Sequence, residues 1–589
     1  MTDHGHPRLY RARPVLALAA VAFVAGAIVG AQSGTSAETS LAASYTRAWT
    51  RGDYAAMYAN LDAASRRAVS AGDFAADYEQ ALRTATASGM RIAGNAREGA
   101  GGVVIVPVKV STRLFGELSL DYAIKVSEAG GEGARVAWSR SLVFPGLRAG
   151  EQLTRTTTLP RRAPLLARDG SVLAGGTPGT GEGQTTEATR SSPLGEAANA
   201  VIGTIGAIPA GRRAALEAQG VPAQAVVGLS GMELALDERL RGTPGGELLA
   251  GSRALAAATS RPAPAVRTSI SPGLQRAAVA ALGGQYGGIV AIAPSTGQVL
   301  AVAGIGLDGL QPPGSTFKII TLTGVLQAGI ANPHTVFPYA TSATLDGVQL
   351  HNANGEECGG TLENAFAVSC NSVFSPLGVK LGSARLVETA EHFGFNQETG
   401  IAGAPKSTLP PASQIQGELD IGSTAIGQGQ VLATPLQMAT VATTIADGGR
   451  RPVPTFLAAA HARYAGHATS SSVARTVRRL MIGVVRSGTG TAAAIPGVTV
   501  AGKTGTAELK AACTASSSSG EASSGEAPKE TCPSGESESS NTDAWFAAFA
   551  PALHPRIAVC VMLVKDGAGG ATAAPVARQV IEAALQAGL

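Results

Sequence analysis

Three short motifs in the C-terminal half of the chain bring together residues that could carry out acyl transfer. They read Ser-Thr-Phe-Lys at 315–318, Ser-Cys-Asn at 369–371 and Lys-Thr-Gly at 503–505. Together they supply two hydroxyls and two amines, which is what a reaction through a serine ester requires. Each motif alone is weak, since Ser-x-x-Lys is expected about once by chance in a chain this long. Their combination predicts an enzyme with a nucleophilic serine.

The first motif is predicted to place its serine at the start of a helix. Residues 312–314 (Pro-Pro-Gly) break the chain, and a helical pattern follows over 316–327. Free N–H groups at a helix N-terminus favour developing negative charge on Ser315, and Lys318 lies one turn further on the same face. A lysine acts as a base only if burial or a nearby cation lowers its pKa, and Lys503 is the candidate cation. Taken alone, the motif is more typical of a capped helix with a surface lysine.

The second motif lies inside an apolar stretch, residues 365–374. Polar side chains in such surroundings cost free energy unless they form hydrogen bonds. Ser369 and Asn371 are therefore predicted to have partners within the fold. The simpler interpretation is a polar turn between two helices.

The third motif is predicted to lie on a β-strand over residues 500–507. This strand would present Lys503, and Gly505 would allow a substrate backbone to approach closely. Thr504 and Thr506 add hydroxyls, and Thr506 also adds a backbone N–H. The alternative is a strand end with a surface lysine.

Residues 266–589 resemble the transpeptidase domain of penicillin-binding proteins. The resemblance rests on PPGSTFK, SCN and KTGTAE, together with AIGQG at 425–429 and AWFAAFAP at 544–551. It implies a β-lactamase-like α/β sandwich, in which an antiparallel sheet carries helices on both faces. It implies neither a metal nor a cofactor.

The resemblance also implies a role for each residue of the motifs. Ser315 would be the acylated nucleophile and Lys318 the base for acylation. The other residues would have supporting roles: Ser369 and Asn371 would relay protons and hold the substrate amide, Lys503 would supply positive charge, and Thr504 and Thr506, with Gly505 between them, would bind the substrate carboxylate. The backbone N–H groups of Ser315 and Thr506 would form the oxyanion hole.

The N-terminal half is predicted to contain two further domains, which gives a multidomain α+β chain. Residues 35–147 combine a helical aromatic stripe with strand-like runs at 102–110, 117–126 and 134–143, and resemble the nuclear-transport-factor-2-like extension of methicillin-resistance-type class B penicillin-binding proteins. Residues 155–265 resemble the linker or dimerisation domain of class B enzymes. No glycosyltransferase pattern precedes residue 266. A polar insertion at 512–541 is predicted to be disordered.

An uncharged apolar run at residues 15–31 follows three arginines. It is just long enough to span a bilayer, and it predicts a cytoplasmic tail at 1–14, a transmembrane anchor and an extracytoplasmic bulk at the cell membrane. A cleaved signal peptide, which would leave a secreted protein, is the alternative.

The five cysteines have no metal-ligand spacing. An oxidising compartment permits disulfides, and Cys513 and Cys532 could close the polar insertion between them. Cys560 is predicted to pack in the core. A net charge of +4 gives no reason to expect a nucleic-acid partner.

These features predict a membrane-anchored peptidoglycan D,D-transpeptidase that cross-links stem peptides ending in D-Ala–D-Ala and binds β-lactams, which mimic them. One alternative is a D,D-carboxypeptidase or β-lactamase, which needs a carboxylate to activate water. Glu388, Glu391 and Glu398 lie between the second and third motifs but in no convincing setting. The other alternative is a non-catalytic scaffold or β-lactam sensor among cell-division or elongation proteins. All the expected catalytic residues are present, which favours an enzyme.

Overall fold

The structure, a computed structural model, describes residues 36–129, 133–176, 190–458, 461–508 and 541–589. The predicted tail and anchor at 1–31, Cys513, Cys532 and nearly all of the 512–541 insertion lie outside these ranges. Within them, no helix combines the length and the apolar character needed to cross a bilayer. The chain divides into two compact units, of which the first holds most of residues 36–151 and the second holds the remainder from residue 152 with two short segments, 81–88 and 111–118.

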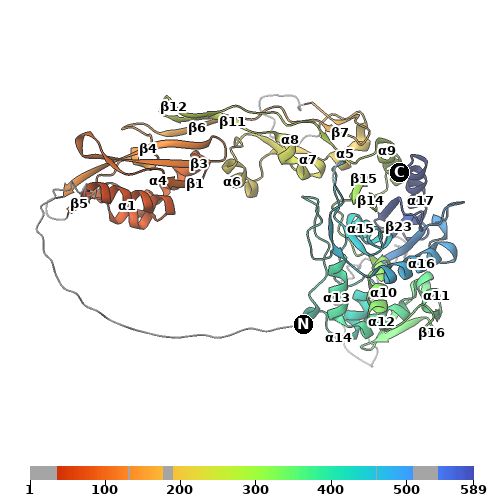
Figure 1. Ribbon diagram of the computed structural model, residues 1–589. Helices are drawn as coiled ribbons and strands as arrows, with labels where there is room; N and C mark the ends of the chain where they lie inside the picture. Colours follow the sequence, from red (N-terminus) through yellow and green to blue (C-terminus); the bar gives the residue numbers. More distant parts are fainter. Residues whose placement is uncertain (1–35, 130–132, 177–189, 459–460, 509–540) are drawn as a thin grey trace, which may run out of the picture. The chain divides into compact units, whose positions relative to one another are not determined.

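The first unit packs helices against an antiparallel sheet (Figure 1). Its helices are α1 (Ala37–Arg51), α2 (Tyr54–Ala59), α3 (Ala63–Ala68) and α4 (Ala71–Thr84), and its strands are β1 (Ala87–Ile92), β2 (Arg97–Glu98), β3 (Val103–Thr112), β4 (Gly116–Ala129) and β5 (Gly133–Val136). The strand order is β1-β3-β4-β5, with β2 paired to β3. Burial alternates along β3, as expected for a strand with one face on a core. The run predicted as a strand at 134–143 is a strand only as far as Val136, because the chain then leaves the sheet and forms a 3₁₀ turn at Arg140–Val143.

Aromatic side chains fill the core of this unit. Tyr45, Trp49 and Met57 of the predicted stripe are all completely buried. The Tyr45 and Tyr78 hydroxyls lie 2.8 Å apart, the Tyr78 and Tyr122 hydroxyls lie 3.0 Å apart, and Tyr122 donates to a backbone carbonyl at 2.6 Å. Burial raises the pKa of Tyr78 to about 12, so this chain of hydroxyls stays neutral.

The segment between the first unit and the transpeptidase-like part is built from short elements. They are β6 (Leu153–Thr158), β7 (Leu165–Leu166), β8 (Val172–Ala174), α5 (Asn199–Ile202), β9 (Ile205–Ala207), α6 (Ala210–Ala218), β10 (Val226–Gly228), α7 (Gly231–Ala235), α8 (Asp237–Arg241), β11 (Gly245–Ala250), β12 (Arg253–Ala258) and β13 (Val266–Arg267). A buried ion-pair cluster holds them together. Glu233 accepts from Arg162 at 2.6 Å and from Arg190 at 2.7 Å, and Asp237 accepts from Arg162 at 2.8 Å. Removing one partner would leave an uncompensated charge in the interior.

A five-stranded antiparallel sheet forms the centre of the C-terminal part. Its strands, in spatial order, are β15 (Gln298–Gly304), β14 (Gly287–Ala293), β24 (Ile557–Leu563), β23 (Thr542–Ala550) and β22 (Ala501–Glu508). The predicted hairpin of β14 and β15 is present. Strand β22, which carries the third motif, lies at one edge and pairs only with β23 among the described strands.

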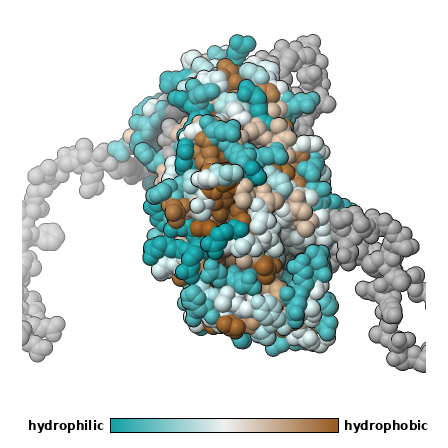
Figure 2. Space-filling model, turned by 90° about the vertical axis from the view of Figure 1, so that its right-hand side faces the viewer, coloured by the Kyte–Doolittle hydropathy of each residue, from teal (hydrophilic) through white to brown (hydrophobic). Residues whose placement is uncertain are grey.

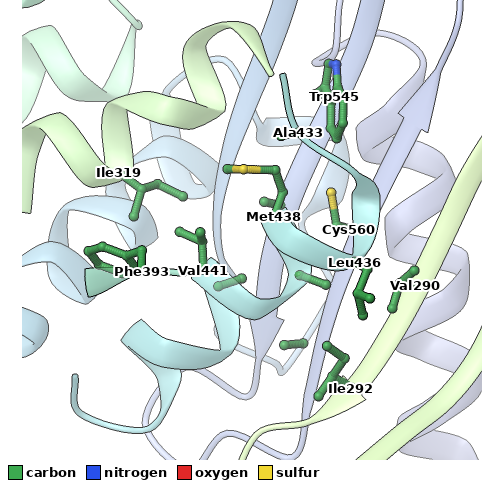
Figure 3. Packing of buried hydrophobic residues seen from close by; sticks show 14 of the residues in the cluster. Val290, Ile292, Ile319, Phe393, Ala433, Leu436, Met438, Val441, Trp545 and Cys560 are labelled. Carbon is green, nitrogen blue, oxygen red and sulfur yellow. The ribbon is translucent and has the colours of Figure 1, made fainter. Parts of the chain in front are cut away.

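Helices cover both faces of this sheet, so alternate residues of each strand enter different cores. Ile289 and Ala291 pack with α9 (Pro272–Leu282) and α17 (Ala573–Gln586). Val290 and Ile292 face the other way, toward α15 (Pro435–Ala446). Figure 3 shows them in one cluster with Leu436 and Met438 of α15 and with Cys560 of β24. The prediction that Cys560 packs in the core is confirmed, since it is fully buried and free.

A mainly helical part lies beside the sheet and is drawn in green in Figure 1. It contains α10 (Lys318–Gln327), β16 (Val336–Ala340), β17 (Ser342–Leu345), β18 (Val348–His351), β19 (Cys358–Thr361), α11 (Leu362–Ala367), α12 (Asn371–Leu381), α13 (Ser383–His392) and α14 (Gly417–Ala425). The hairpin β20 (Arg450–Pro452) and β21 (Tyr464–His467) and the amphipathic α16 (Ser471–Ser487) complete the chain. On the face shown in Figure 2, hydrophilic residues surround a smaller apolar patch.

Candidate active site

Ser315 lies in a 3₁₀ turn, Gly314–Phe317, that leads directly into α10. Gly314 fixes this turn in two ways. It has a φ of 51°, and its N–H donates to the Gly427 carbonyl at 3.0 Å. Ser315 is half-buried, and its hydroxyl has no hydrogen-bond partner among the described residues. The hydroxyl is therefore free to turn toward a substrate.

Lys318, the first residue of α10, reaches across to the second motif. Its side chain is completely buried. The Nζ atom donates to the Ser369 carbonyl at 2.7 Å, to Ser369 Oγ at 3.3 Å and to Asn371 Oδ1 at 2.6 Å. The amine is thus held by the second motif rather than by the Ser315 hydroxyl, as is common before substrate binds.

The second motif forms the turn between α11 and α12. Ser369 has a φ of 63°, a left-handed conformation that is uncommon for a residue other than glycine. This conformation directs both its carbonyl and its hydroxyl toward Lys318. Asn371 starts α12, and its Nδ2 atom donates to the His351 carbonyl at 2.8 Å, which orients Oδ1 toward Lys318.

The third motif lies on β22, the edge strand. Lys503 is completely buried, and its Nζ atom donates to Ser369 Oγ at 2.8 Å and to the Thr504 carbonyl at 3.1 Å. Thr504 Oγ1 pairs with the Thr489 hydroxyl. The structure therefore brings both lysines to one hydroxyl, Ser369 Oγ, from motifs that are far apart in the sequence.

Gly505 and its neighbour Thr506 pack closely against the turn that carries Ser315. A Cβ atom on Gly505 would lie 2.7 Å from the Pro313 carbonyl oxygen, and one on Gly314 would lie 2.6 Å from the Thr506 carbonyl oxygen. From the sequence, Gly505 is predicted to allow the close approach of a substrate. The structure adds that this glycine is required for β22 to lie against the Ser315 turn.

The two lysines share an environment that disfavours positive charge. Burial lowers the pKa of Lys503 to about 7. Burial, and then the charge of Lys503, hold the pKa of Lys318 well below its usual value. Each amine also lies over an aromatic ring, with Lys318 Nζ 5.6 Å from the centre of the Phe374 ring and Lys503 Nζ 5.5 Å from that of Phe366. No carboxylate of the described residues forms an ion pair with either amine. A neutral amine at neutral pH is what a base for serine activation needs.

Three stretches of the chain match known protein families. Residues 287–582 match the family described as the penicillin binding protein transpeptidase domain. The chain belongs to this family. Residues 177–253 match the penicillin-binding protein dimerisation domain, and residues 37–151 match the NTF2-like N-terminal transpeptidase domain.

Individual members of the family align with most of the chain. Peptidoglycan D,D-transpeptidase PbpA of Mycobacterium tuberculosis is 32% identical over 386 residues, which cover 54% of this chain and 72% of PbpA. Peptidoglycan D,D-transpeptidase MrdA of Acinetobacter baumannii is 28% identical over 459 residues, covering 67% of this chain and 66% of MrdA. The crystal structure of M. tuberculosis PBPA superimposes with a TM-score of 0.54 at 27% identity, covering 72% of this chain and 99% of PBPA. That protein has also been solved as a penicillin G acyl-enzyme complex.

A groove of about 760 Å³ begins beside Asn371 of this penicillin-binding domain. Its lining includes three glutamines from different segments. Gln349 lies on β18, Gln414 precedes α14 and Gln428 follows it. Asp420 and Glu508 contribute carboxylates, and the lining includes neither lysine nor arginine. Glu508 is the last residue of β22, so the groove continues the line of the third motif.

Four features of the site were missed in the sequence analysis. Cys370, inside the second motif, is joined to Cys358 by a disulfide. Thr489 pairs with Thr504, the His351 carbonyl orients Asn371, and Gly427 supports the Ser315 turn. Only Gly427 had a signal in the sequence, since it lies in the AIGQG stretch. The others depend on contacts between distant segments.

Proposed function

We propose that this chain is a class B peptidoglycan D,D-transpeptidase that forms an acyl-enzyme on Ser315. Its substrates are stem peptides ending in D-Ala–D-Ala, and β-lactams acylate the same serine. The main support is that two buried amines meet at Ser369 Oγ, one of them on Lys318, a single turn along the chain from Ser315. The relatives of the chain are named for this activity.

Acylation needs a path for one proton. Ser315 Oγ attacks the carbonyl carbon of the penultimate D-Ala, and its proton passes to the neutral Lys318 amine. The peptide C–N bond then breaks, and the leaving D-Ala amine takes a proton through Ser369 Oγ, which both lysines contact. An amine of a second stem attacks the ester, loses its proton by the same route, and releases Ser315 as the cross-link forms.

The edge of β22 that pairs with no described strand would give the substrate its direction. An extended peptide that pairs antiparallel with β22 runs from the Glu508 end toward the Lys503 end. Its terminal carboxylate then lies near Lys503 and the hydroxyls of Thr504 and Thr506. The residues that precede D-Ala–D-Ala enter the groove beside Asn371 and Glu508, where glutamine side chains offer partners to the peptide backbone.

An amine rather than water as the acceptor agrees with the surroundings of the site. The carboxylates considered for water activation are occupied or exposed. Glu391 accepts from Asn396, Glu398 pairs with Lys406, and Glu388 is exposed on α13. A non-catalytic scaffold would have no need for two buried lysines, whose desolvation costs stability.

We also propose that residues 15–31 anchor the chain in the cell membrane with its bulk outside, where peptidoglycan and division or elongation proteins are accessible. The apolar run and the preceding arginines support this location. Fractionation should find the full chain in the membrane pellet, and residues 36–589 should be released from it.

The experiment that tests the proposed function follows the intact mass of the protein during incubation with a reporter penicillin. Wild type should gain one long-lived adduct, and Ser315→Ala should gain none. The purified protein should also release D-Ala from a stem peptide and form cross-linked product when an acceptor amine is supplied. Rapid hydrolysis of the adduct would favour a β-lactamase, and acylation without D-Ala release would favour a sensor.

A further inference from the structure

The second motif contains a covalent link that its serine and asparagine do not explain. Cys370 lies between Ser369 and Asn371, and its sulfur is bonded to Cys358 at the start of β19. Cys370 is completely buried and Cys358 is 7% exposed. The disulfide therefore joins the catalytic turn to a neighbouring strand beneath the protein surface.

The Ser369 turn has a conformation that its own sequence does not favour. A serine in the left-handed region is strained, and such a conformation persists only where the surroundings hold it. On one side, the Cys370 N–H donates to the Ala365 carbonyl at 2.9 Å, and the Thr489 N–H donates to the Ala367 carbonyl at 3.1 Å. These contacts hold α11, which precedes the turn.

The disulfide holds the other side of the turn through β19. This strand pairs with β16, with Cys358 opposite Ala340. Asn352 fastens the same region, because its Nδ2 atom donates to the Ala340 and Glu356 carbonyls, each at 2.8 Å, and its Oδ1 atom accepts from the Ser372 N–H at 2.8 Å. Cys358 is therefore a fixed point to which Cys370 is tied.

The position of this turn decides whether the catalytic groups meet. Lys318 Nζ contacts the Ser369 carbonyl, Ser369 Oγ and Asn371 Oδ1, and Lys503 Nζ contacts Ser369 Oγ. All four hydrogen bonds end on the two residues that flank Cys370. A movement of the turn by 1 Å would lengthen all of them together, and a misplacement of that size costs about 100-fold in rate.

We propose that Cys358 and Cys370 are positioning residues for acyl transfer, and that their disulfide must be intact for rapid acylation of Ser315. This inference rests on the proposed function. Reducing the bond leaves the sheet and its helices folded but frees the Ser369 turn from β19. The chemical step then slows, whereas the affinity of the initial non-covalent complex in the groove stays the same.

The test compares oxidised and reduced forms of the full chain in a Cys513→Ser/Cys532→Ser background, so that only one disulfide responds. A water-soluble phosphine breaks the S–S bond. Water supplies two protons and one oxygen, two thiols form, and the phosphine becomes its oxide. Thiol labelling after the protein is unfolded, followed by mass measurement, should find one thiol, Cys560, in the oxidised form and three in the reduced form.

The reduced protein should be acylated by a reporter penicillin about 10- to 100-fold more slowly. The loss should fall on the acylation rate constant, with the dissociation constant of the non-covalent complex unchanged. Removing the phosphine and adding oxidised glutathione, which re-forms the disulfide and yields two reduced glutathiones, should restore the rate. Cys358→Ala/Cys370→Ala should be slow in both conditions and insensitive to the reductant.

The outcomes separate this inference from the proposed function. Suppose that the thiol count shows complete reduction and that the reduced protein is acylated as fast as the oxidised protein. This result would overturn the positioning role and leave the proposed transpeptidase function standing. A rate loss accompanied by loss of the near-ultraviolet circular dichroism would also overturn it, since the bond would then support folding rather than position. If the oxidised protein is not acylated at all, the proposed function itself fails.

Discussion

Replacing Lys503 with methionine should move the pH dependence of acylation and not only reduce its rate. In the proposed mechanism Lys318 acts as a base when neutral, so acylation should fall as the pH drops through its pKa. The charge of Lys503 is one of the two causes that lower this pKa. Methionine fills a similar volume without charge, so Lys318 should hold its proton to a higher pH. The acid limb of the profile should therefore shift upward.

The size of the effect follows from the geometry. Both ammonium nitrogens contact Ser369 Oγ, at 3.3 and 2.8 Å, so they lie no more than about 6 Å apart. Two unit charges at about 6 Å repel by about 3 kcal/mol at an effective dielectric constant of about 20. Lys503 itself has a pKa of about 7, so this repulsion acts fully only below that pH. On the acid limb, the acylation rate constant of the variant should fall by a factor at least about tenfold larger than the factor by which it falls on the plateau.

The assay measures the second-order rate constant for acylation by a reporter penicillin between pH 5.5 and 9. Lys503→Arg is the matched control, because it keeps a cation at the same place and should keep the acid limb at or below its wild-type position. The plateau rate constant of Lys503→Arg is expected to fall, since the longer side chain changes the geometry of the site. An acid limb at the same pH in wild type and Lys503→Met would refute electrostatic coupling between the lysines. Burial alone would then set the pKa of Lys318.

Three further predictions concern stability and packing. Gly427→Ala should lower the acylation rate at least about tenfold, because the new Cβ would lie 2.1 Å from the Gly314 carbonyl oxygen. Gly429→Ala is the matched control, because Gly429 has a similar φ of 71° but no atom lies closer than 3.9 Å to the new Cβ, so this change should cost only about 1–2 kcal/mol of stability. If both variants lost the same fraction of the acylation rate, the packing argument would be contradicted. Tyr78→Phe should destabilise the first unit by about 1–3 kcal/mol, seen by calorimetry, with unchanged acylation, because two buried hydroxyls lose a partner. Lys503 has a pKa of about 7 in the fold against 10.5 in the unfolded chain, so the folded state binds fewer protons between these values. Denaturant unfolding should therefore show stability rising with pH across this window more steeply in wild type than in Lys503→Met, and parallel curves would refute the assignment.

The parts of the site that could be predicted from the sequence are those that depend on local chemistry. Pro312–Gly314 ends one segment and allows Ser315 to start the next, and the sequence VAGKTGTA around Lys503 is enough to predict a strand. Likewise, the apolar residues around Ser369 require that its polar groups find partners, which proved to be the two lysines. In each case the signal lies within a few residues, although the partners of Ser369 are 51 and 134 residues away in the sequence.

The disulfide could not be predicted in this way. Five cysteines allow several pairings, and the flanks of the insertion favoured Cys513 with Cys532, which lie outside the described residues. Cys358 and Cys370 meet because β19 pairs with β16 beside the start of α12, an arrangement of the whole helical part. The buried cluster around Arg162 could not be predicted for the same reason, since its partner Glu233 is 71 residues away.

The electrostatic design of the site explains why a second serine stands between the two lysines. A buried amine usually gains a carboxylate, which would keep it protonated and useless as a base. Here the described surroundings of Lys318 and Lys503 are hydroxyl, carbonyl, amide and aromatic groups, so neither amine is stabilised as a cation by an opposite charge. Their mutual repulsion then favours states in which only one of the two amines is charged, and in the proposed mechanism Ser369 Oγ, hydrogen-bonded to both, relays the proton between them. A carboxylate introduced at this position, as in Ser369→Asp, should therefore abolish acylation more completely than Ser369→Ala, because it would hold both lysines in their charged forms.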